Sequence, residues 1–139
     1  MKSSGLTTVT EDPNTGALVG LHIDDWYNAP LTSRSDAPNR VCINLGCEER
    51  SFLFLPLSIA RIWDAVGNIE SGVKHTSVAR LFMRMVSCYP IVRLRVRPGE
   101  GYIAPTENIV HDGSSKDMSS LDVSLSLRGH FELSNCRQR

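Results

Sequence analysis

The sequence predicts a mainly β protein, an antiparallel barrel or jelly roll with one or two short helices inserted in it. Three observations support this prediction. Six or so segments alternate apolar and polar residues with the period of a strand. Two segments in the middle of the chain have helical spacing instead. The repeated strand–helix order of a parallel sheet is absent, and so are the glycine-rich loops that bind nucleotides.

The strands are predicted where valine, leucine and isoleucine alternate with polar side chains. They cover residues 17–26, 40–45, 51–55, 91–97, 102–111 and 122–133. We expect Pro56 to end the third strand and Pro105 to interrupt the fifth. The polar N-terminal segment, residues 1–16, is predicted to be flexible or to lie at a sheet edge. Residues 28–39 and 112–120 are predicted loops.

Two helices are predicted between the third and fourth strands. Ser58 suits the N-cap of a helix over 59–66, and Gly67 suits its C-terminal stop. The second helix is predicted over 74–87, because its apolar residues recur every three or four positions. The chain of 139 residues is expected to form a single compact domain.

Composition argues against several classes of partner. Apolar residues make up 41% of the chain and charged residues 22%, which are ordinary globular values. Lysine and arginine together number 15, as do aspartate and glutamate, so no excess charge favours a nucleic-acid partner. No apolar run approaches the roughly 18 residues of a membrane-spanning helix, and no apolar signal segment opens the chain. We therefore expect a cytoplasmic protein with a small-molecule partner, no nucleic acid and no membrane, which could form a homodimer.

The four cysteines are expected to be thiols in that compartment. Cys42 and Cys47 have four residues between them, but no second close pair exists to complete a zinc site. We therefore interpret them as buried or surface thiols.

The residues that suggest chemistry begin with Leu21-His22-Ile23-Asp24. On a strand, residues i and i+2 project from one face, so His22 and Asp24 would lie side by side as two metal ligands. His111 is the best candidate for a third ligand, because it ends an extended segment beside a Gly/Ser-rich loop. Two histidines and one carboxylate on one face of an octahedron are typical of non-haem Fe(II) oxygenases.

A His-x-Asp pair alone is a weak signal, and a solvated strand end is the competing interpretation, since Asp25 follows Asp24 directly. Further along, Arg128 shares a strand face with Ser126, and a guanidinium beside a hydroxyl can hold a carboxylate. In this order of His-x-Asp, distal His and late Arg, the chain resembles the Fe(II)- and 2-oxoglutarate-dependent oxygenases from about residue 18 to 131. The resemblance implies a double-stranded β-helix, which is a jelly-roll or cupin-like barrel.

The resemblance also implies Fe(II) on the two histidines and the aspartate, with 2-oxoglutarate and dioxygen in the open positions. Arg128 and Ser126 would hold the far carboxylate of 2-oxoglutarate, and Asn44 would touch this cosubstrate. The implied reaction is hydroxylation or another oxidation of a C–H bond in a small metabolite, such as an amino acid or natural-product intermediate. Halogenating members carry a small residue in place of the carboxylate, so Asp24 favours hydroxylation.

Three residues are candidates for contact with the substrate. Trp26 lies one strand step beyond Asp24, although an aromatic residue there could equally be core. Glu107 shares a face with His111 if that segment is regular. Arg95 belongs to a row of arginines whose ordinary interpretation is a solvated strand face.

Two other functions stay open. A cupin-like metal-binding isomerase or binding module would use the same triad but would not need Arg128. An inactive relative could act as a binding or assembly subunit. Turnover of 2-oxoglutarate to succinate by the iron-loaded protein would separate these alternatives.

Overall fold

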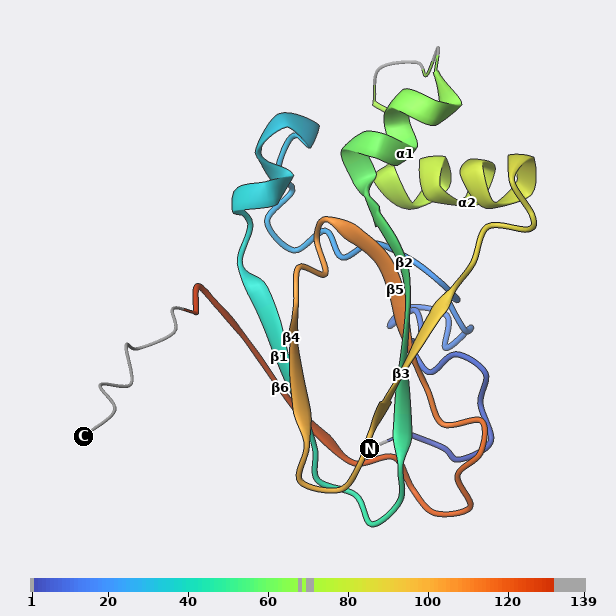
Figure 1. The fold of residues 1–139 in the computed structure, drawn as a ribbon, viewed down its shortest axis with the longest axis vertical. Helices are drawn as coiled ribbons and strands as arrows, with labels where there is room; N and C mark the ends of the chain where they lie inside the picture. Colours follow the sequence, from blue (N-terminus) through green and yellow to red (C-terminus); the bar gives the residue numbers. More distant parts are fainter. Residues whose placement is uncertain (1, 68, 70–71, 132–139) are drawn as a thin grey trace.

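The structure is a computed structural model, and it describes residues 2–67, 69 and 72–131. Within these residues the chain forms two three-stranded antiparallel sheets and a few short helices (Figure 1). The strands are β1 (Asn39–Asn44), β2 (Arg50–Ser58), β3 (Val92–Val96), β4 (Gly101–Ala104), β5 (Ile109–Ser114) and β6 (Ser124–Gly129). The helices are the 3-10 helix η1 (Leu31–Asp36), α1 (Ile59–Val66) and α2 (His75–Met85). The predicted mainly β fold with short inserted helices is confirmed.

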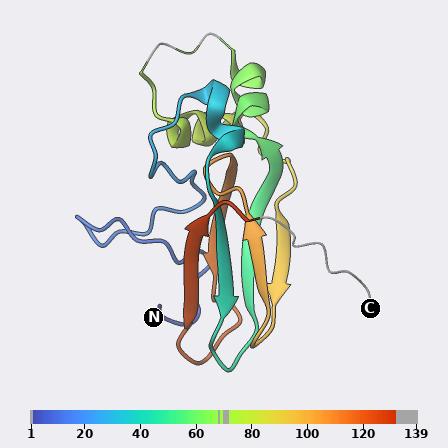
Figure 2. The same ribbon diagram turned by 90° about the vertical axis from the view of Figure 1, so that its left-hand side faces the viewer.

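The strand orders are β4-β1-β6 in one sheet and β3-β2-β5 in the other. Figure 2 looks onto the first sheet, where β6, β1 and β4 lie side by side in front of the second. No ladder joins the two sheets in the described part of the chain, so a closed barrel, which the sequence predicted, is not formed there. Strands β3 and β4 follow each other in sequence but belong to different sheets, which leaves their facing edges unpaired.

The ladder register decides which side chains face the space between the sheets. Arg40 of β1 lies opposite Arg128 of β6, and both reach inwards to the region of His111 on β5. Phe52 of β2 stacks on Tyr102 of β4, with ring centroids 4.2 Å apart. The space between the sheets therefore combines an aromatic contact with buried charged groups.

The apolar core lies where α1 and α2 pack on the end of β2. It consists of Ile23, Leu55, Ile59, Ile62, Val78, Ala79, Phe82 and Val110. Figure 1 shows both α-helices at one end of the two sheets, away from the turns at the other end. No helix among the described residues is long and apolar enough to cross a membrane.

The two α-helices confirm the sequence prediction closely. Helix α1 has the predicted bounds, and the hydroxyl of Ser58 accepts the N–H of Arg61 at 3.4 Å as its N-cap. Gly67 follows it with a φ of 61°, a conformation that glycine adopts without strain. Helix α2 is two residues shorter at its C-terminal end than the predicted 74–87.

The predicted strand over 17–26 is wrong. This segment makes isolated bridges, one of which joins His22 to His111 of β5, and no ladder. Gly20 has a φ of 77°, which interrupts the extended conformation just before that bridge. The metal-ligand motif is therefore carried by an irregular segment that touches the sheet at one point.

Pro56 does not end its strand, because β2 continues to Ser58. Pairing with β3 stops at Phe54, and pairing with β5 shifts register between Phe54 and Ser58. Pro56 therefore lies where no regular ladder bond needs its missing N–H.

The remaining boundaries differ by a few residues. The predicted strand 102–111 is two strands, β4 and β5, separated by a turn that begins at Pro105, as expected. The predicted loop 112–120 begins later, because β5 extends to Ser114. The predicted loop 28–39 contains η1, and β6 covers the middle of the predicted strand 122–133, whose last two residues lie outside the described residues.

The N-terminal segment lies against β5 and the loop that follows it. Lys2 bridges Asp122, and Leu6 accepts the backbone N–H of Ser115 at 3.0 Å. The hydroxyl of Thr10 donates to the carboxylate of Asp112 at 2.7 Å. These contacts join the start of the chain to the strand that carries His111.

Candidate metal site

His22, Asp24 and His111 come together between the two sheets. The N–H of His22 donates to the carbonyl of His111 at 3.0 Å, and the N–H of His111 donates back at 2.8 Å. One ligand atom from each of the three residues lies within 4.8 Å of the other two. All three side chains are buried. This group could hold a metal ion.

The hydrogen bonds of the two histidines set which ring nitrogen faces the carboxylate of Asp24. Nδ1 of His22 lies 2.8 Å from the carbonyl of Gly20, and Nδ1 of His111 lies 3.1 Å from the carbonyl of Ile109. Because a carbonyl only accepts, each Nδ1 carries a proton. Nε2 of His111 keeps its lone pair, whereas the hydrogen bond between His22 and Asp24 needs a proton on Nε2 of His22. The two Nε2 atoms lie 3.5 and 3.8 Å from the carboxylate oxygens of Asp24. Metal-binding histidines are usually fixed in this way by a second hydrogen bond.

Two arginines surround the carboxylate. Nη2 of Arg128 lies 2.9 Å from Oδ2 of Asp24. Nη1 of Arg40 lies 3.6 Å from the same oxygen, while its Nη2 lies 2.5 Å from Nε2 of His111. Arg40 was not among the predicted site residues. The alternation of the strand, which puts Arg40 on the face opposite Val41, is the sequence feature that could have indicated it.

Electrostatics favours the metal-binding forms of Asp24 and His111. Burial raises the pKa of Asp24, but its hydrogen bond with His22 and the charge of Arg40 outweigh this and hold the pKa well below its usual range. Burial, with the charge of Arg40, lowers the pKa of His111 to about 3. Burial also lowers the pKa of His22, yet the hydrogen bond with Asp24 outweighs it and the net shift is upward. Asp24 is therefore ionised and His111 neutral near pH 7.

This donor set fits a divalent metal ion. It offers two imidazole nitrogens and one carboxylate, which are ligands that iron, zinc and related metals accept. Three protein ligands also leave positions open for small molecules, as catalytic metal sites require.

The predicted cosubstrate residues differ in their surroundings. Besides its bond to Asp24, Arg128 has a buried Nη1 that finds no hydrogen-bond partner among the described residues. Ser126 is exposed and lines a cavity of about 130 Å³ together with Arg40 and Tyr102. Asn44 is fully buried, and its amide donates to the carbonyls of Glu48, in the turn after β1, and Val96, on β3, and accepts the N–H of Gly46.

Of the predicted substrate contacts, Trp26 lies at the site. Its ring is 72% exposed, and the guanidinium of Arg128 lies 4.8 Å from the ring centroid. Glu107 is buried, and its carboxylate accepts the backbone N–H of Trp26 at 3.1 Å. Arg95 is exposed on β3, where its Nε lies 3.8 Å from Oε1 of Glu49. It has no contact with the triad among the described residues.

The three cysteines among the described residues do not contribute to the site. Cys42, Cys47 and Cys88 are free thiols, which confirms the prediction for these three, and Cys136 lies outside the described residues.

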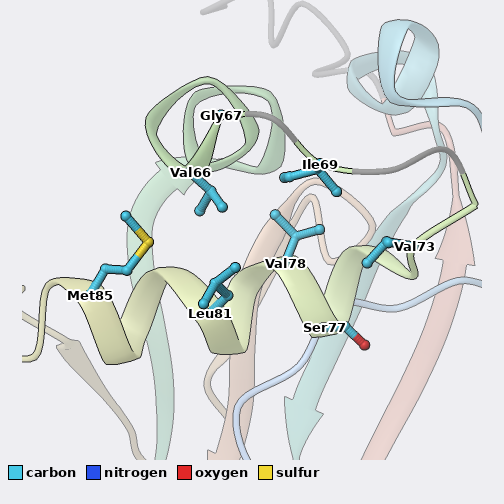
Figure 3. Close-up of a pocket in the computed structure, with 8 residues that line it drawn as sticks. All are labelled: Val66, Gly67, Ile69, Val73, Ser77, Val78, Leu81 and Met85. Atoms are coloured by element: carbon cyan, nitrogen blue, oxygen red, sulfur yellow. The ribbon is translucent and has the colours of Figure 1, made fainter.

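A separate cavity of about 440 Å³ lies between α1 and α2, and Figure 3 shows side chains from both helices pointing into it. Its lining residues are Val66, Gly67, Ile69, Val73, Ser77, Val78, Leu81 and Met85. None of these side chains is an acid, a base or a strong metal ligand. The triad is therefore the better candidate for chemistry.

Comparisons with known proteins add no relative to this picture. The chain matches no protein-family model, and no curated protein or solved structure matches it. The function must therefore be argued from the site.

Proposed function

We propose that this protein is an Fe(II)- and 2-oxoglutarate-dependent oxygenase that hydroxylates, or otherwise oxidises, a C–H bond of a small metabolite. The observation that supports the proposal most is the buried group of His22, Asp24 and His111, with both Nε2 atoms directed at one carboxylate. Two histidines and a carboxylate with open positions are typical of this class of iron enzyme.

The path of the chain supports the double-stranded β-helix expected for such an enzyme. Strand β1 belongs to the first sheet, β2 and β3 to the second, β4 to the first, β5 to the second and β6 to the first. A chain that winds helically between two facing sheets produces this alternation. The bridge at His22 adds a contact on the free side of β5, where a further strand of the second sheet would lie.

The arginines at the site support an anionic cosubstrate. Arg40 and Arg128 both face the triad, while the carboxylate that they share is that of Asp24. A divalent metal would add positive charge, so a dianion such as 2-oxoglutarate would restore the balance. Arg128 would use Nη1, which has no hydrogen-bond partner among the described residues, for the far carboxylate, and Ser126, two residues earlier on β6, would assist it. Iron and 2-oxoglutarate, when bound, supply the oxidising chemistry, with succinate and carbon dioxide as products.

The substrate would meet Trp26, whose exposed ring lies beside the triad. Asp24 leaves no ligand position for a halide in place of the carboxylate, which favours hydroxylation. The chain's own contribution is to orient the substrate and to shelter the site between the sheets.

The test is conversion of 2-oxoglutarate to succinate by the iron-loaded protein, followed by NMR with and without pools of candidate amino acids. His111→Ala is the control, because it removes one ligand from the interior. We expect slow uncoupled turnover by the wild type and none by the control. Equal succinate formation by both proteins would contradict the proposal.

A metal-binding isomerase or binding module of the same shape is the second candidate. The observation that favours it is that both arginines contact the triad itself, so neither is reserved for a cosubstrate. Tight metal binding without any binding of 2-oxoglutarate would select this candidate.

A further inference from the structure

Arg34, in η1, is a buried charged residue next to the metal-ligand motif. Its side chain is 1% exposed. Nε donates to the carbonyl of Ala29 at 3.0 Å, and Nη1 donates to the carbonyls of Asp24 at 2.8 Å and Glu107 at 3.1 Å. Nη2 donates to the carboxylate of Asp25. One guanidinium therefore joins the loop before β1, the ligand segment and the turn before β5.

The turn before β5 completes this arrangement. The carbonyl of Thr106 accepts the N–H of Asp24 at 3.1 Å. The buried carboxylate of Glu107 accepts the N–H of Trp26 at 3.1 Å, and its second oxygen lies 3.8 Å from Arg34. The backbone is thus held at the N–H of Asp24, at its carbonyl and again two residues later.

These contacts are needed because the ligand segment is not a strand. A ladder would hold each residue by regular hydrogen bonds, whereas here the pairing ends with the bridge at His22. Asp24 lies beyond that bridge, so its direction depends on polar contacts from other segments. A buried ion pair adds little net stability, but donors aimed at backbone carbonyls do set geometry.

We infer that Arg34 is a positioning residue of the metal site, which orients the Asp24 carboxylate by holding its backbone carbonyl, with Glu107 as its partner. The inference rests on the metal-binding role proposed above. It adds η1 and the turn at 105–108 to the site. Arg34 acts through the backbone carbonyl of Asp24, and no contact among the described residues joins a side chain of η1 to the three ligand atoms.

The test uses Co(II) as the probe metal, with affinity from titration and ligand geometry from the visible absorption spectrum. Arg34→Met removes all the donors, and we expect about 10- to 100-fold weaker binding and an altered spectrum, as for other partners of metal ligands. Arg34→Lys keeps the charge but loses the planar fork, so we expect an intermediate loss.

Arg50→Lys is the matched control. Arg50 is also buried, and it pairs with Asp122 instead of any residue of the ligand segment. We expect it to lower the stability while the Co(II) affinity and spectrum stay unchanged.

The outcomes separate the hypotheses. Wild-type affinity and spectrum in Arg34→Lys and in any folded Arg34→Met would overturn the inference and leave the metal site standing. An equal loss in Arg50→Lys would also overturn it, because general destabilisation would explain both. If Arg34→Met does not fold, the comparison of the two lysine variants decides. Absence of Co(II) binding by the wild type would refute the metal site itself.

Discussion

At the scale of single residues, hydrogen bonds decide which ring atom each histidine of the triad offers to a metal. Bonds to backbone carbonyls place a proton on Nδ1 of both His22 and His111, so Nε2 is the atom that each would offer. Asp24 is ionised because a neighbouring imidazole and guanidinium favour its charged form more than burial opposes it. A metal ion would therefore meet a carboxylate that needs no deprotonation and a neutral His111.

The lowered pKa of His111 predicts a loss of stability in mild acid. In the unfolded chain His111 takes up a proton near pH 6.5, whereas the native residue stays neutral down to about pH 3. Stability is therefore lost as pH falls below about 6.5, and the loss from this residue between pH 7 and 5 is about 2 kcal/mol. Urea unfolding of the metal-free protein at the two pH values measures it.

The control is His111→Asn, which cannot titrate, so its stability should fall by about 2 kcal/mol less over the same window. His22, whose pKa is raised, contributes with the opposite sign, and its contribution is common to both proteins. An equal loss in the two proteins would show that His111 is not held neutral.

Removal of Arg128 should separate binding of the cosubstrate from binding of the metal. Arg128→Ala loses a charge-assisted bond worth about 1.5–3 kcal/mol, which is roughly tenfold to more than a hundredfold in 2-oxoglutarate affinity. Metal affinity should not fall, because one positive charge is removed from beside Asp24. Calorimetry measures the Mn(II) affinity of the metal-free protein and then the 2-oxoglutarate affinity of the anaerobic Mn(II)-loaded protein.

Arg97→Ala is the matched control, since Arg97 follows β3 with a side chain that is 75% exposed and lies beside Glu49. It should leave both affinities unchanged. Unchanged 2-oxoglutarate affinity in Arg128→Ala would assign the carboxylate to another cation, with Arg40 next.

At the scale of elements, the helices stabilise the end of the sheets that bears the site. Helix α1 follows β2 without a loop, and Ile59 and Ile62 bury its inner face completely. Ile23, between two metal ligands, belongs to the same core, so packing of the helices also holds the ligand segment.

Truncation in this core should cost far more than truncation at an exposed position of the helix pair. Ile62→Ala removes a fully buried side chain and should lower the free energy of unfolding by about 2–5 kcal/mol. Leu81→Ala, at a position that is 45% exposed, should cost less than about 1 kcal/mol. Urea unfolding of the two variants tests this, and similar losses would show that α1 and α2 do not pack as described.

At the scale of the whole molecule, the two sheets are joined by side chains instead of a ladder. The guanidinium of Arg50 on β2 contacts the carboxylate of Asp122, which precedes β6, at 2.9 and 3.1 Å. Phe52 and Tyr102 stack across the same space. These contacts hold the two sheets together.

Breaking the buried ion pair should be strongly destabilising. Asp122→Ala leaves the charge of Arg50 buried without its partner, at a cost of about 3–5 kcal/mol. The double variant Arg50→Met/Asp122→Leu replaces both charges by apolar groups and should recover most of that loss. Equilibrium unfolding measures both proteins. A double variant no more stable than Asp122→Ala would show that the pair does not act as a coupled unit.

The sequence by itself determined the local features. The bounds of α1 follow from Ser58 and Gly67, because caps act within one turn of the helix. The alternation that places Ile23 in the core, with His22 and Asp24 on the opposite side, also follows from local spacing. This alternation holds even though the segment is not a strand, since any extended stretch alternates its side chains.

Only the tertiary structure decided which distant groups meet. Nothing in the local pattern distinguishes the buried Arg34 and Glu107 from solvated charges, because burial depends on segments that are far apart in the sequence. Arg40 reaches His111 through the register of three strands and the approach of two sheets. Alternation predicts a face, but the partner of that face is set by long-range packing, which a periodic pattern does not contain.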